Sequence, residues 1–183
     1  MSGRNRVRII GGEWRSRLVR FPGTPGLRPT PDRVRETLFN WLGQRLDGLS
    51  CVDLFAGSGA LGFEALSRGA ARVVMIDRDR LAVEALKEAA RELGATGADV
   101  VAADSIAWLG RGTEKFDVAF VDPPYASDLA AQALAKLGPR LNPGARVYVE
   151  SAKPLEPGAP WRETREGKAG AVRFALYEYE ISQ

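Results

Sequence analysis

The sequence predicts an α/β fold with a mainly parallel sheet that ends in an antiparallel hairpin. Three features lead to this prediction. An apolar stretch runs into a glycine-rich turn at 52–62, apolar and helical segments then alternate up to residue 149, and two strand-like segments follow at 161–164 and 172–181. Such alternation is typical of a parallel sheet, because each helical crossover returns the chain to the same edge. Two strands joined by a tight turn must instead run antiparallel.

The first 26 residues are expected to form a basic β extension. Two short β-type stretches flank Gly11-Gly12, which is consistent with a hairpin or a bulge. Arginines alternate with other residues in both stretches, so they should share one face of each strand. With Trp14 between them, this pattern is typical of a nucleic-acid-binding arm, although a charged edge that prevents aggregation would look the same. The candidate nucleic-acid-binding residues, one of them beyond the extension, are Arg4, Arg6, Arg8, Arg15, Arg17, Arg20 and Arg28.

The charge distribution favours the nucleic-acid interpretation. Residues 1–50 contain ten arginines and four acidic residues, whereas the remainder contains sixteen lysines and arginines and nineteen acidic residues. The formal net charge of the whole chain is only +3, and the excess of positive charge lies in the N-terminal 50 residues. Arginine suits phosphate contacts because its planar guanidinium donates two parallel hydrogen bonds.

A helix is predicted after the turn-rich segment 21–26. Thr30 is a good N-cap residue, and Pro31 suits the first helical position. Apolar residues then recur at helical spacing and should form one buried face, namely Val34, Leu38, Trp41 and Leu42. The start of this helix is also suited to an anionic group through three residues, Thr30, Arg33 and Arg35.

Alternating strands and helices make up the rest of the chain. In order, the expected elements are a strand at 51–55, a helix at 59–68, a strand at 72–77, a helix at 80–93, a strand at 98–102, a short helix after Asp104-Ser105, a strand at 116–121, a helix at 128–140 and a strand at 145–149. The two C-terminal strands should be joined by a turn at 167–170. We therefore divide the chain into a basic extension, residues 1–26, and a main domain, residues 27–183.

The glycine turn predicts an adenosine cofactor. Gly57, Gly59 and Gly62 form the pattern G-x-G-x-x-G, and Asp77 follows twenty residues after Gly57 at the end of the next strand. Glycines let a ligand lie against bare backbone, and the helix start beyond them presents free N–H groups. An acid at this distance is placed to hold a ribose diol. The alternative is a glycine-rich turn that binds no ligand.

Asp53 distinguishes between two common adenosine cofactors. NAD would bring a pyrophosphate to the turn, and a carboxylate four residues before Gly57 would repel it. S-Adenosyl-L-methionine has no phosphate and carries a sulfonium and an ammonium, so a nearby acid favours its binding. Asp53 therefore favours the methyl donor, although it could instead cap the turn by accepting from backbone N–H groups.

The segment Asp122-Pro123-Pro124-Tyr125 follows the strand at 116–121 and indicates the reaction. The carboxyl ends of strands carry the site in an open α/β sheet, so this segment should face the glycine turn. The prolines remove two N–H donors and leave the Asp122 carboxylate and carbonyl oxygens as acceptors, while Tyr125 offers a ring for stacking. These features suit an exocyclic amine on an aromatic base. A rigid turn after a strand is the alternative.

An amine of this kind is a poor nucleophile because its lone pair is delocalised into the ring. Hydrogen bonds from the amine to Asp122 and to the Pro123 carbonyl would draw the nitrogen towards tetrahedral geometry and free the lone pair for attack. We expect direct methyl transfer without a covalent bond between enzyme and base, which fits a chain whose one cysteine, Cys51, begins an apolar strand. The proton would leave through Asp122 or water.

Composition excludes several other classes of protein. Histidine is absent, so a Ser-His-Asp triad and a Cys/His zinc site are excluded, and a single cysteine excludes an internal disulfide. No apolar stretch approaches the roughly 20 residues that span a membrane, and no apolar signal-peptide region follows residues 1–6. We expect a cytoplasmic protein with no metal and no membrane partner.

The chain resembles the RsmD family of bacterial methyltransferases from about residue 8 to the C-terminal hairpin. Its D-P-P-Y motif is similar to motif IV of enzymes that methylate exocyclic amines of adenine, cytosine or guanine. The family implies a Rossmann-like class I methyltransferase fold, S-adenosyl-L-methionine as cofactor, and methylation of N2 of one guanine in 16S ribosomal RNA. The segments that carry the resemblance are Arg8-Ile9-Ile10-Gly11-Gly12, Leu27-Arg28-Pro29-Thr30, Asp32-Arg33-Val34-Arg35-Glu36, Phe39-Asn40-Trp41-Leu42, Asp53-Leu54-Phe55-Ala56-Gly57-Ser58-Gly59 and Asp122-Pro123-Pro124-Tyr125.

The resemblance also implies roles for single residues. Asp53 and the turn glycines would hold the methionine end of the cofactor, and Asp77 would hold the ribose hydroxyls. Asp104 with the Ser105 backbone would contact the adenine, and Thr30 would close the pocket. The basic extension would grip RNA in an assembled or assembling small ribosomal subunit, and we expect a monomer. The implied catalytic residues are Asp122, Pro123, Pro124 and Tyr125, and the cofactor-binding residues are Thr30, Asp53, Phe55, Gly57, Gly59, Asp77, Arg78, Asp104, Ser105 and Asp122.

The sequence leaves three alternative functions open. A DNA or RNA adenine-N6 methyltransferase would share D-P-P-Y, but a DNA enzyme usually adds a target-recognition domain, for which 183 residues leave little room. An NAD-dependent oxidoreductase would share the glycines but would have no use for Asp53 or D-P-P-Y. A non-catalytic RNA-binding module would explain the basic extension but not the cofactor turn.

Overall fold

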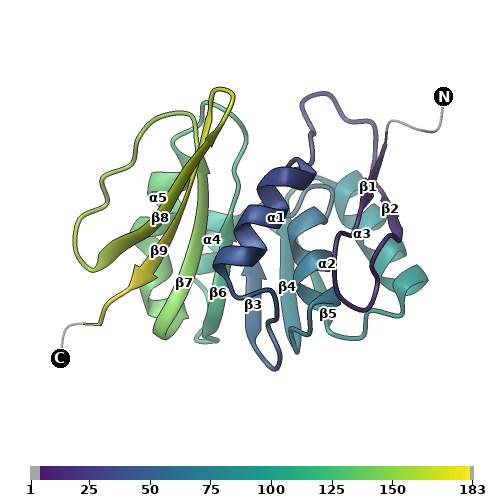
Figure 1. Cartoon of the computed structure of the whole chain (residues 1–183), viewed down its shortest axis with the longest axis horizontal. Helices are drawn as coiled ribbons and strands as arrows, with labels where there is room; N and C mark the ends of the chain where they lie inside the picture. The colour runs from purple at the N-terminus through teal and green to yellow at the C-terminus, as the bar shows by residue number, and fades with distance from the viewer. Residues whose placement is uncertain (1–4, 182–183) are drawn as a thin grey trace.

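The computed structural model describes residues 5–181, and a seven-stranded sheet runs through its centre (Figure 1). The strand order is β5-β4-β3-β6-β7-β9-β8. Strands β3 to β7 pair in parallel, whereas β9 pairs antiparallel with both β7 and β8. The predicted parallel sheet with a closing hairpin is therefore confirmed. The strands are β3 (Ser50–Asp53), β4 (Arg72–Asp77), β5 (Ala98–Ala102), β6 (Phe116–Val121), β7 (Leu141–Ser151), β8 (Trp161–Ala169) and β9 (Val172–Tyr179).

Helices cover both faces of the sheet and bury two apolar layers. Figure 1 shows α1 in front of the central strands and α4 and α5 behind them. One layer, with α1, α2 and α3, contains Cys51 and Val73, and the other, with α4 and α5, contains their neighbours Val52 and Val74. Successive side chains of a strand point to opposite faces, which explains this alternation. The helices are α1 (Asp32–Trp41), α2 (Ala60–Ser67), α3 (Arg80–Leu93), α4 (Ser105–Leu109) and α5 (Leu129–Leu137), followed by the 3₁₀ helix η1 (Gly138–Arg140).

The bounds of β3 and β7 differ by a few residues from the prediction. β3 ends at Asp53, two residues earlier than expected, so the glycine turn begins soon after this acid. β7 is longer than the predicted 145–149, because Leu141 already pairs with Phe116 across an irregularity in the register. At its other end β7 continues to Ser151 and so reaches the edge where the strand ends gather.

The C-terminal hairpin is confirmed, but its turn is tighter than predicted. The two strands are joined at 170–171, not over 167–170. Gly167 lies inside β8, opposite Phe174. A Cβ atom at this position would come within 2.5 Å of the Phe174 ring, so glycine is needed there for packing and not for a turn.

The basic extension contains a two-stranded antiparallel sheet, β1 (Arg6–Arg8) and β2 (Leu18–Arg20). Val7 and Val19 are paired in register, and both are buried. Because side chains alternate along a strand, the flanking residues face the other way. The predicted common face of alternating arginines is therefore confirmed for β1, where it contains Arg6 and Arg8, and Arg20 of β2 lies on the same face.

The loop between β1 and β2 differs from the predicted arm. Arg15 lies in a turn and Arg17 precedes β2, so the second stretch of alternating arginines is not a strand. Trp14 is only 9% exposed and packs into the main core, so the prediction that it serves as an aromatic contact for nucleic acid is wrong. Arg4 lies outside the described residues.

A buried carboxylate of α2 accepts hydrogen bonds from the backbone of this loop. Glu64 is fully buried, and its oxygens accept hydrogen bonds from the backbone N–H groups of Ile10 and Gly11, each at 2.9 Å. The guanidinium groups of Arg35 and Arg68 neutralise its charge. A buried charge is tolerated only when it is paired and hydrogen-bonded in this way. The extension therefore packs as part of the core.

The start of α1 also differs from the prediction. Pro31, not Thr30, is the N-cap residue, and no side chain in the described part of the chain caps this helix. Arg35 is 1% exposed, and its guanidinium donates to the Thr30 carbonyl, the Arg8 carbonyl and the Asp32 carboxylate. Burial lowers the pKa of Arg35 because desolvation disfavours its charged form. These contacts occupy Arg35, so it is not available to an anionic ligand.

Candidate active site

A cavity of about 910 Å³ opens at the carboxyl ends of the parallel strands. Residues that follow β3, β4, β5 and β6 line it, together with the end of β7 and the segment 24–31 in front of α1. The strand order reverses between β3 and β6, because the chain proceeds to β4 and β5 on one side and to β7 on the other. Open α/β sheets bind ligands in the crevice at such a switch point. The volume lies at the upper end of the roughly 300–1,000 Å³ typical of ligand sites.

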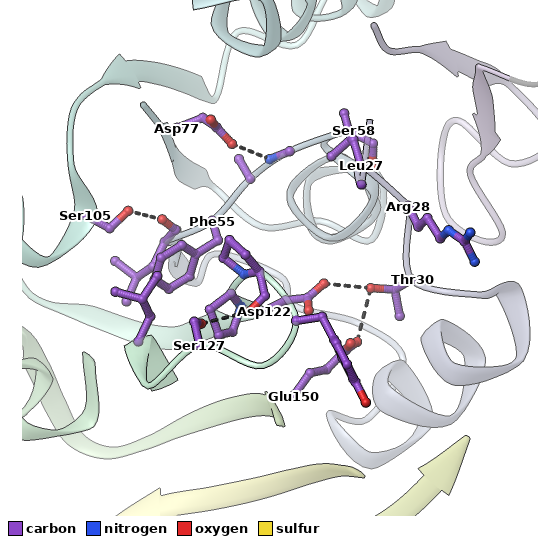
Figure 2. A pocket seen from close by; sticks show the side chains of 18 of the residues that line it. Leu27, Arg28, Thr30, Phe55, Ser58, Asp77, Ser105, Asp122, Ser127 and Glu150 are labelled. Carbon is purple, nitrogen blue, oxygen red and sulfur yellow. Dashed lines mark hydrogen bonds between the residues drawn. The ribbon is translucent and has the colours of Figure 1, made fainter. Parts of the chain in front are cut away.

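The glycine turn forms one side of the cavity and is held by Asp77 (Figure 2). Oδ2 of Asp77 accepts the backbone N–H of Gly57 at 2.9 Å, and Oδ1 accepts that of Asp79 at 2.9 Å. Gly57 lines the cavity with φ +53°, and Gly59 has φ +83°, a conformation that strains residues with a Cβ. Gly59 is not among the described lining residues. A Cβ there would come within 2.6 Å of the Phe63 ring, which gives this glycine a packing role.

Asp53 lies beneath the turn and is 1% exposed. Its Oδ1 atom is buried and has no hydrogen-bond partner within residues 5–181. Burial raises the pKa of Asp53 from 3.8 to about 7, and the charge of Asp77 adds to this shift, while backbone N–H groups of Phe55 and Gly62 oppose it. A buried oxygen without a partner is costly. The site is therefore prepared for a ligand that brings a positive charge or a hydrogen-bond donor.

The proline corner, residues 122–125, lines the same cavity from the end of β6, and so faces the glycine turn as predicted. The Thr30 hydroxyl lies 3.1 Å from Oδ2 of Asp122. One of the predicted carbonyl acceptors is already occupied, because the Pro124 carbonyl accepts the Ser127 hydroxyl at 2.7 Å. The Asp122 carboxylate and the Pro123 carbonyl remain as the predicted acceptors of this corner, and no group within residues 5–181 donates to that carbonyl.

A second carboxylate, Glu150 at the end of β7, was missed by the sequence prediction (Figure 2). Oγ1 of Thr30 lies 3.1 Å from Oε1 of Glu150, and the Tyr148 hydroxyl donates to the same oxygen at 2.7 Å. Burial and the neighbouring Glu150 hold the pKa of Asp122 well above its usual range, and the same two causes raise the pKa of Tyr148. Glu150 directly follows the apolar segment 145–149, so the strand-end rule could have identified it.

The other residues assigned to the cofactor also line the cavity. Phe55 is half-buried, and Arg78 is exposed. Asp104 caps α4 by accepting a backbone N–H of that helix at 2.9 Å, and the Ser105 hydroxyl donates to the Leu54 carbonyl. Of the ten residues that the sequence assigned to the cofactor, the structure thus brings all but Gly59 to the cavity lining.

The described arginines assigned to RNA lie mainly outside the cavity. Arg17 donates to the Glu92 carbonyl at 2.9 Å and so ties its loop to α3. Arg28 is exposed and lines the cavity, close in sequence to Thr30. At the other side, Tyr125 is 69% exposed, which leaves its ring available for stacking. The remaining described members of the set, which are exposed or half-buried, are Arg6, Arg8, Arg15 and Arg20.

The one cysteine of the chain, Cys51, is buried in β3. Burial raises the pKa of the Cys51 thiol to about 12, so this side chain is held in its protonated form. Among residues 5–181, no group of three or more acidic, cysteine or histidine side chains is arranged to hold a metal ion. In that same part of the chain, no helix is long and apolar enough to span a bilayer.

Comparison with known proteins identifies the family. The model of a family described as conserved hypothetical protein 95 matches residues 7–178. Ribosomal RNA small subunit methyltransferase D of Escherichia coli strain K12 is 43% identical over 186 residues, which cover 98% of this chain and 93% of that protein. The chain belongs to the methyltransferase D family. The resemblance stated from the sequence motifs is therefore confirmed.

Solved structures agree with this family assignment. The Escherichia coli protein yhhF is 42% identical to this chain and superposes with a TM-score of 0.88, covering 97% of this chain and 99% of that one. An RNA methyltransferase from Salinibacter ruber in complex with S-adenosyl-L-homocysteine superposes with a TM-score of 0.68 over 85% of this chain and 96% of that one, at 19% identity, which shows the fold alone. The predicted Rossmann-like class I methyltransferase fold is confirmed.

Proposed function

We propose that this protein transfers a methyl group from S-adenosyl-L-methionine to the exocyclic N2 amine of one guanine in 16S ribosomal RNA. The observation that supports this most strongly is that the proline corner and the glycine turn line one cavity. The name of its Escherichia coli relative supports small-subunit ribosomal RNA as the substrate. We further propose that the protein acts as a monomer in the cytoplasm, on an assembled or assembling small subunit.

The lining residues fit this cofactor. When bound, S-adenosyl-L-methionine supplies an electrophilic methyl group attached to a sulfonium. The Asp53 oxygen that has no partner within residues 5–181 would receive the cofactor's ammonium. Asp77, which holds the turn, would bind the ribose hydroxyls, and Asp104 would contact the adenine. The position of each side chain on the cavity lining, and the donors or charge that the cofactor offers, support these assignments.

Residues of the proline corner would prepare the base. Asp122 would accept an N–H of the amine and hold its nitrogen near the methyl group, while the exposed ring of Tyr125 would stack on the base. Such positioning is worth roughly 7–11 kcal/mol in the ideal limit. After transfer, the nitrogen must lose a proton, and the raised pKa of Asp122 suits its carboxylate to receive it directly or through water.

The proposed reaction can be tested by incubating the protein with tritiated S-adenosyl-L-methionine and small ribosomal subunits that lack base modifications. We expect tritium in the 16S RNA, at one site, and in N2-methylguanosine after digestion to nucleosides. Label in N6-methyladenosine would instead support the adenine alternative. Absence of label from RNA, with cofactor binding intact, would contradict the proposal.

Cofactor affinity should depend on pH because of Asp53. Its raised pKa of about 7 means that the carboxylate is ionised above that pH and protonated below it. Only the ionised form attracts an ammonium, so the affinity for S-adenosyl-L-homocysteine should fall by about tenfold per pH unit as the pH drops below 7. Calorimetry between pH 5.5 and 8.5 would measure this. Asp53→Asn should bind more weakly at pH 8 and lose the steep dependence, whereas an unchanged pH profile would remove Asp53 from the cofactor site.

RNA binding should depend on the outward arginines of β1 and β2. Deleting the extension would remove core residues such as Trp14 and Val19 and expose the apolar side chains that they cover, so substitution is the better test. The triple variant Arg6→Gln, Arg8→Gln, Arg20→Gln should bind RNA more weakly, and the slope of log affinity against log salt should become less steep by roughly two, because fewer counterions are released. Filter binding across a salt series would measure both.

A matched triple variant at the opposite edge of the molecule provides the control. Arg162, Arg165 and Lys168 are exposed cations on β8, the outermost strand at the hairpin end of the sheet. Their replacement by glutamine removes the same charge but should leave the salt slope within about half a unit of the wild type. Equal losses in the two variants would show that net charge, and not the β1–β2 face, governs RNA binding.

A further inference from the structure

Two carboxyl groups from neighbouring parallel strands meet at the proline corner (Figure 2). Asp122 follows β6 and Glu150 lies at the end of β7, and both line the cavity. Oγ1 of Thr30 lies 3.1 Å from Oδ2 of Asp122 and 3.1 Å from Oε1 of Glu150, so the two carboxyl groups share one neighbour. The predicted amine chemistry uses Asp122 and the Pro123 carbonyl, which leaves the role of Glu150 to be explained.

The hydrogen-bond donors around this pair are too few to satisfy it. The Thr30 hydroxyl has one hydrogen and can donate to only one of the two carboxyl groups at a time. The Tyr148 hydroxyl donates to Oε1 of Glu150 at 2.7 Å. Oδ1 of Asp122 and Oε2 of Glu150 receive no hydrogen bond from residues 5–181. The pair thus offers two adjacent acceptors to whatever enters the cavity.

The bases that carry an exocyclic amine differ in the ring atom beside it. In guanine, N1 carries a hydrogen next to the N2 amine, so the base presents two neighbouring donors. In adenine, N1 beside the N6 amine is an acceptor, and in cytosine N3 beside the N4 amine is an acceptor. A second carboxylate beside Asp122 would hydrogen-bond guanine but would be left facing a lone pair of adenine or cytosine.

We propose that Glu150 accepts the N1–H of the target guanine while Asp122 accepts an N–H of its N2 amine, so that the pair of carboxylates selects guanine. This inference rests on the proposed function and names the residue that determines its base specificity. Tyr148 is a positioning residue, because its hydroxyl fixes Oε1 of Glu150 and leaves Oε2 for the base. Burial, the charge of Glu150 and a hydrogen bond between the two carboxyl groups raise the pKa of Asp122, and the donors of a bound guanine would allow both carboxyl groups to ionise.

The test compares guanine with 2-aminopurine at the methylated position. 2-Aminopurine keeps the amine that is methylated, but it has a lone pair at N1 in place of the N–H and a hydrogen at C6 in place of the carbonyl oxygen. The change of preference in Glu150→Gln therefore separates recognition of N1 from recognition of the carbonyl. Small subunits would be reconstituted with 16S RNA that carries either base at the mapped site, and kcat/KM would be measured for the wild type and for Glu150→Gln. Glu156→Gln is the matched control, because Glu156 is an exposed glutamate on the segment that follows β7. S-Adenosyl-L-homocysteine affinity reports whether each variant is folded.

We expect the wild type to prefer guanine by at least about 10²-fold, as sites built to hydrogen-bond a substrate group reject analogues that lack it. In Glu150→Gln the preference should fall below about tenfold, because the glutamine amide can donate to N1 of 2-aminopurine. Glu156→Gln should keep the wild-type preference.

Three outcomes would overturn the inference. Equal turnover of the two bases by the wild type would show that N1–H is not recognised. A preference that is unchanged in Glu150→Gln would assign recognition to another residue. If Glu150→Gln does not bind S-adenosyl-L-homocysteine, Tyr148→Phe is measured in its place. A preference for guanine that is unchanged in Tyr148→Phe would then contradict the role of Asp122 and Glu150 in base selection. If wild-type protein forms no N2-methylguanosine at all, the proposed function itself fails.

Discussion

Replacement of Asp122 by alanine should lower kcat for methyl transfer by at least about 10²-fold, a loss typical of removing one group that stabilises a transition state. Asp122 is the carboxylate that the proline corner presents to the cavity, and an alanine side chain has no atom that could accept the amine hydrogens. The cofactor contacts proposed for Asp53 and Asp77 remain, so affinity for S-adenosyl-L-homocysteine should change by less than about threefold. Single-turnover methylation with tritiated cofactor would measure the rate, and calorimetry the affinity.

Asp128→Ala is the matched control for this variant. Asp128 is an exposed acid in the same connection between β6 and α5, and its side chain makes no capping hydrogen bond within the described residues. Its rate should stay within about twofold of the wild type. If Asp122→Ala turns over as fast as this control, the proline corner is a rigid turn and not the amine site. If Asp122→Ala loses rate only through weaker cofactor binding, the carboxylate belongs to the cofactor pocket alone.

Replacement of Glu64 by alanine should destabilise the fold by about 3–5 kcal/mol, because it removes the buried carboxylate that pairs with Arg68 and accepts two backbone N–H groups. Glu64 is fully buried between Arg35 and Arg68, and it accepts the backbone N–H groups of Ile10 and Gly11. The variant would remove the acid that pairs with Arg68 and would leave Arg35 paired with Asp32. It would also leave two backbone N–H groups without an acceptor at the joint between the extension and α2. Urea denaturation would measure the free energy of unfolding.

Glu88→Ala provides the comparison for that measurement. Glu88 is an exposed glutamate on α3 that pairs with Arg91. An exposed ion pair contributes little, so this variant should change the free energy of unfolding by less than about 1 kcal/mol. Similar losses in the two variants would mean that the Glu64 network adds no more than a surface pair, and that apolar packing alone holds the extension in place.

The fold could be predicted in large part because strand and helix periodicities repeat along the chain. Strands 72–77, 98–102 and 116–121 have the predicted bounds, and so does the helix 80–93. Boundaries failed where side chains from distant segments decide them. The hairpin turn was misplaced because Gly167 looked like a turn residue, whereas its lack of a Cβ is required by the Phe174 ring across the sheet.

Most of the site could be predicted from one rule, that the carboxyl ends of parallel strands meet at one edge. Asp53, Asp77 and the proline corner all follow a strand and all line the cavity. Glu150 satisfies the same rule, but no recognised motif surrounds it. Thr30 was expected to cap α1, but it does not. Its hydroxyl lies instead within hydrogen-bond distance of the carboxyl groups of Asp122 and Glu150 in the cavity.

The basic extension was the least predictable part, because arginines and tryptophan look alike whether they contact RNA or the protein itself. Trp14 is in the core, and Arg35 is buried against its own chain. Charge counting cannot separate these residues from Arg8 and Arg20, which do face outward. The partners that distinguish them lie far away in sequence: Arg35 pairs with Glu64, and the Trp14 backbone N–H donates to the Ser67 hydroxyl, 53 residues further along the chain.

A crystal structure of the protein with S-adenosyl-L-homocysteine would test the central claim most directly. We expect the adenosine ribose beside Asp77, the ammonium at the buried oxygen of Asp53, and the sulfur atom directed across the cavity towards Asp122. A sulfur atom that points away from the proline corner, or a cofactor that itself occupies the corner, would contradict the account.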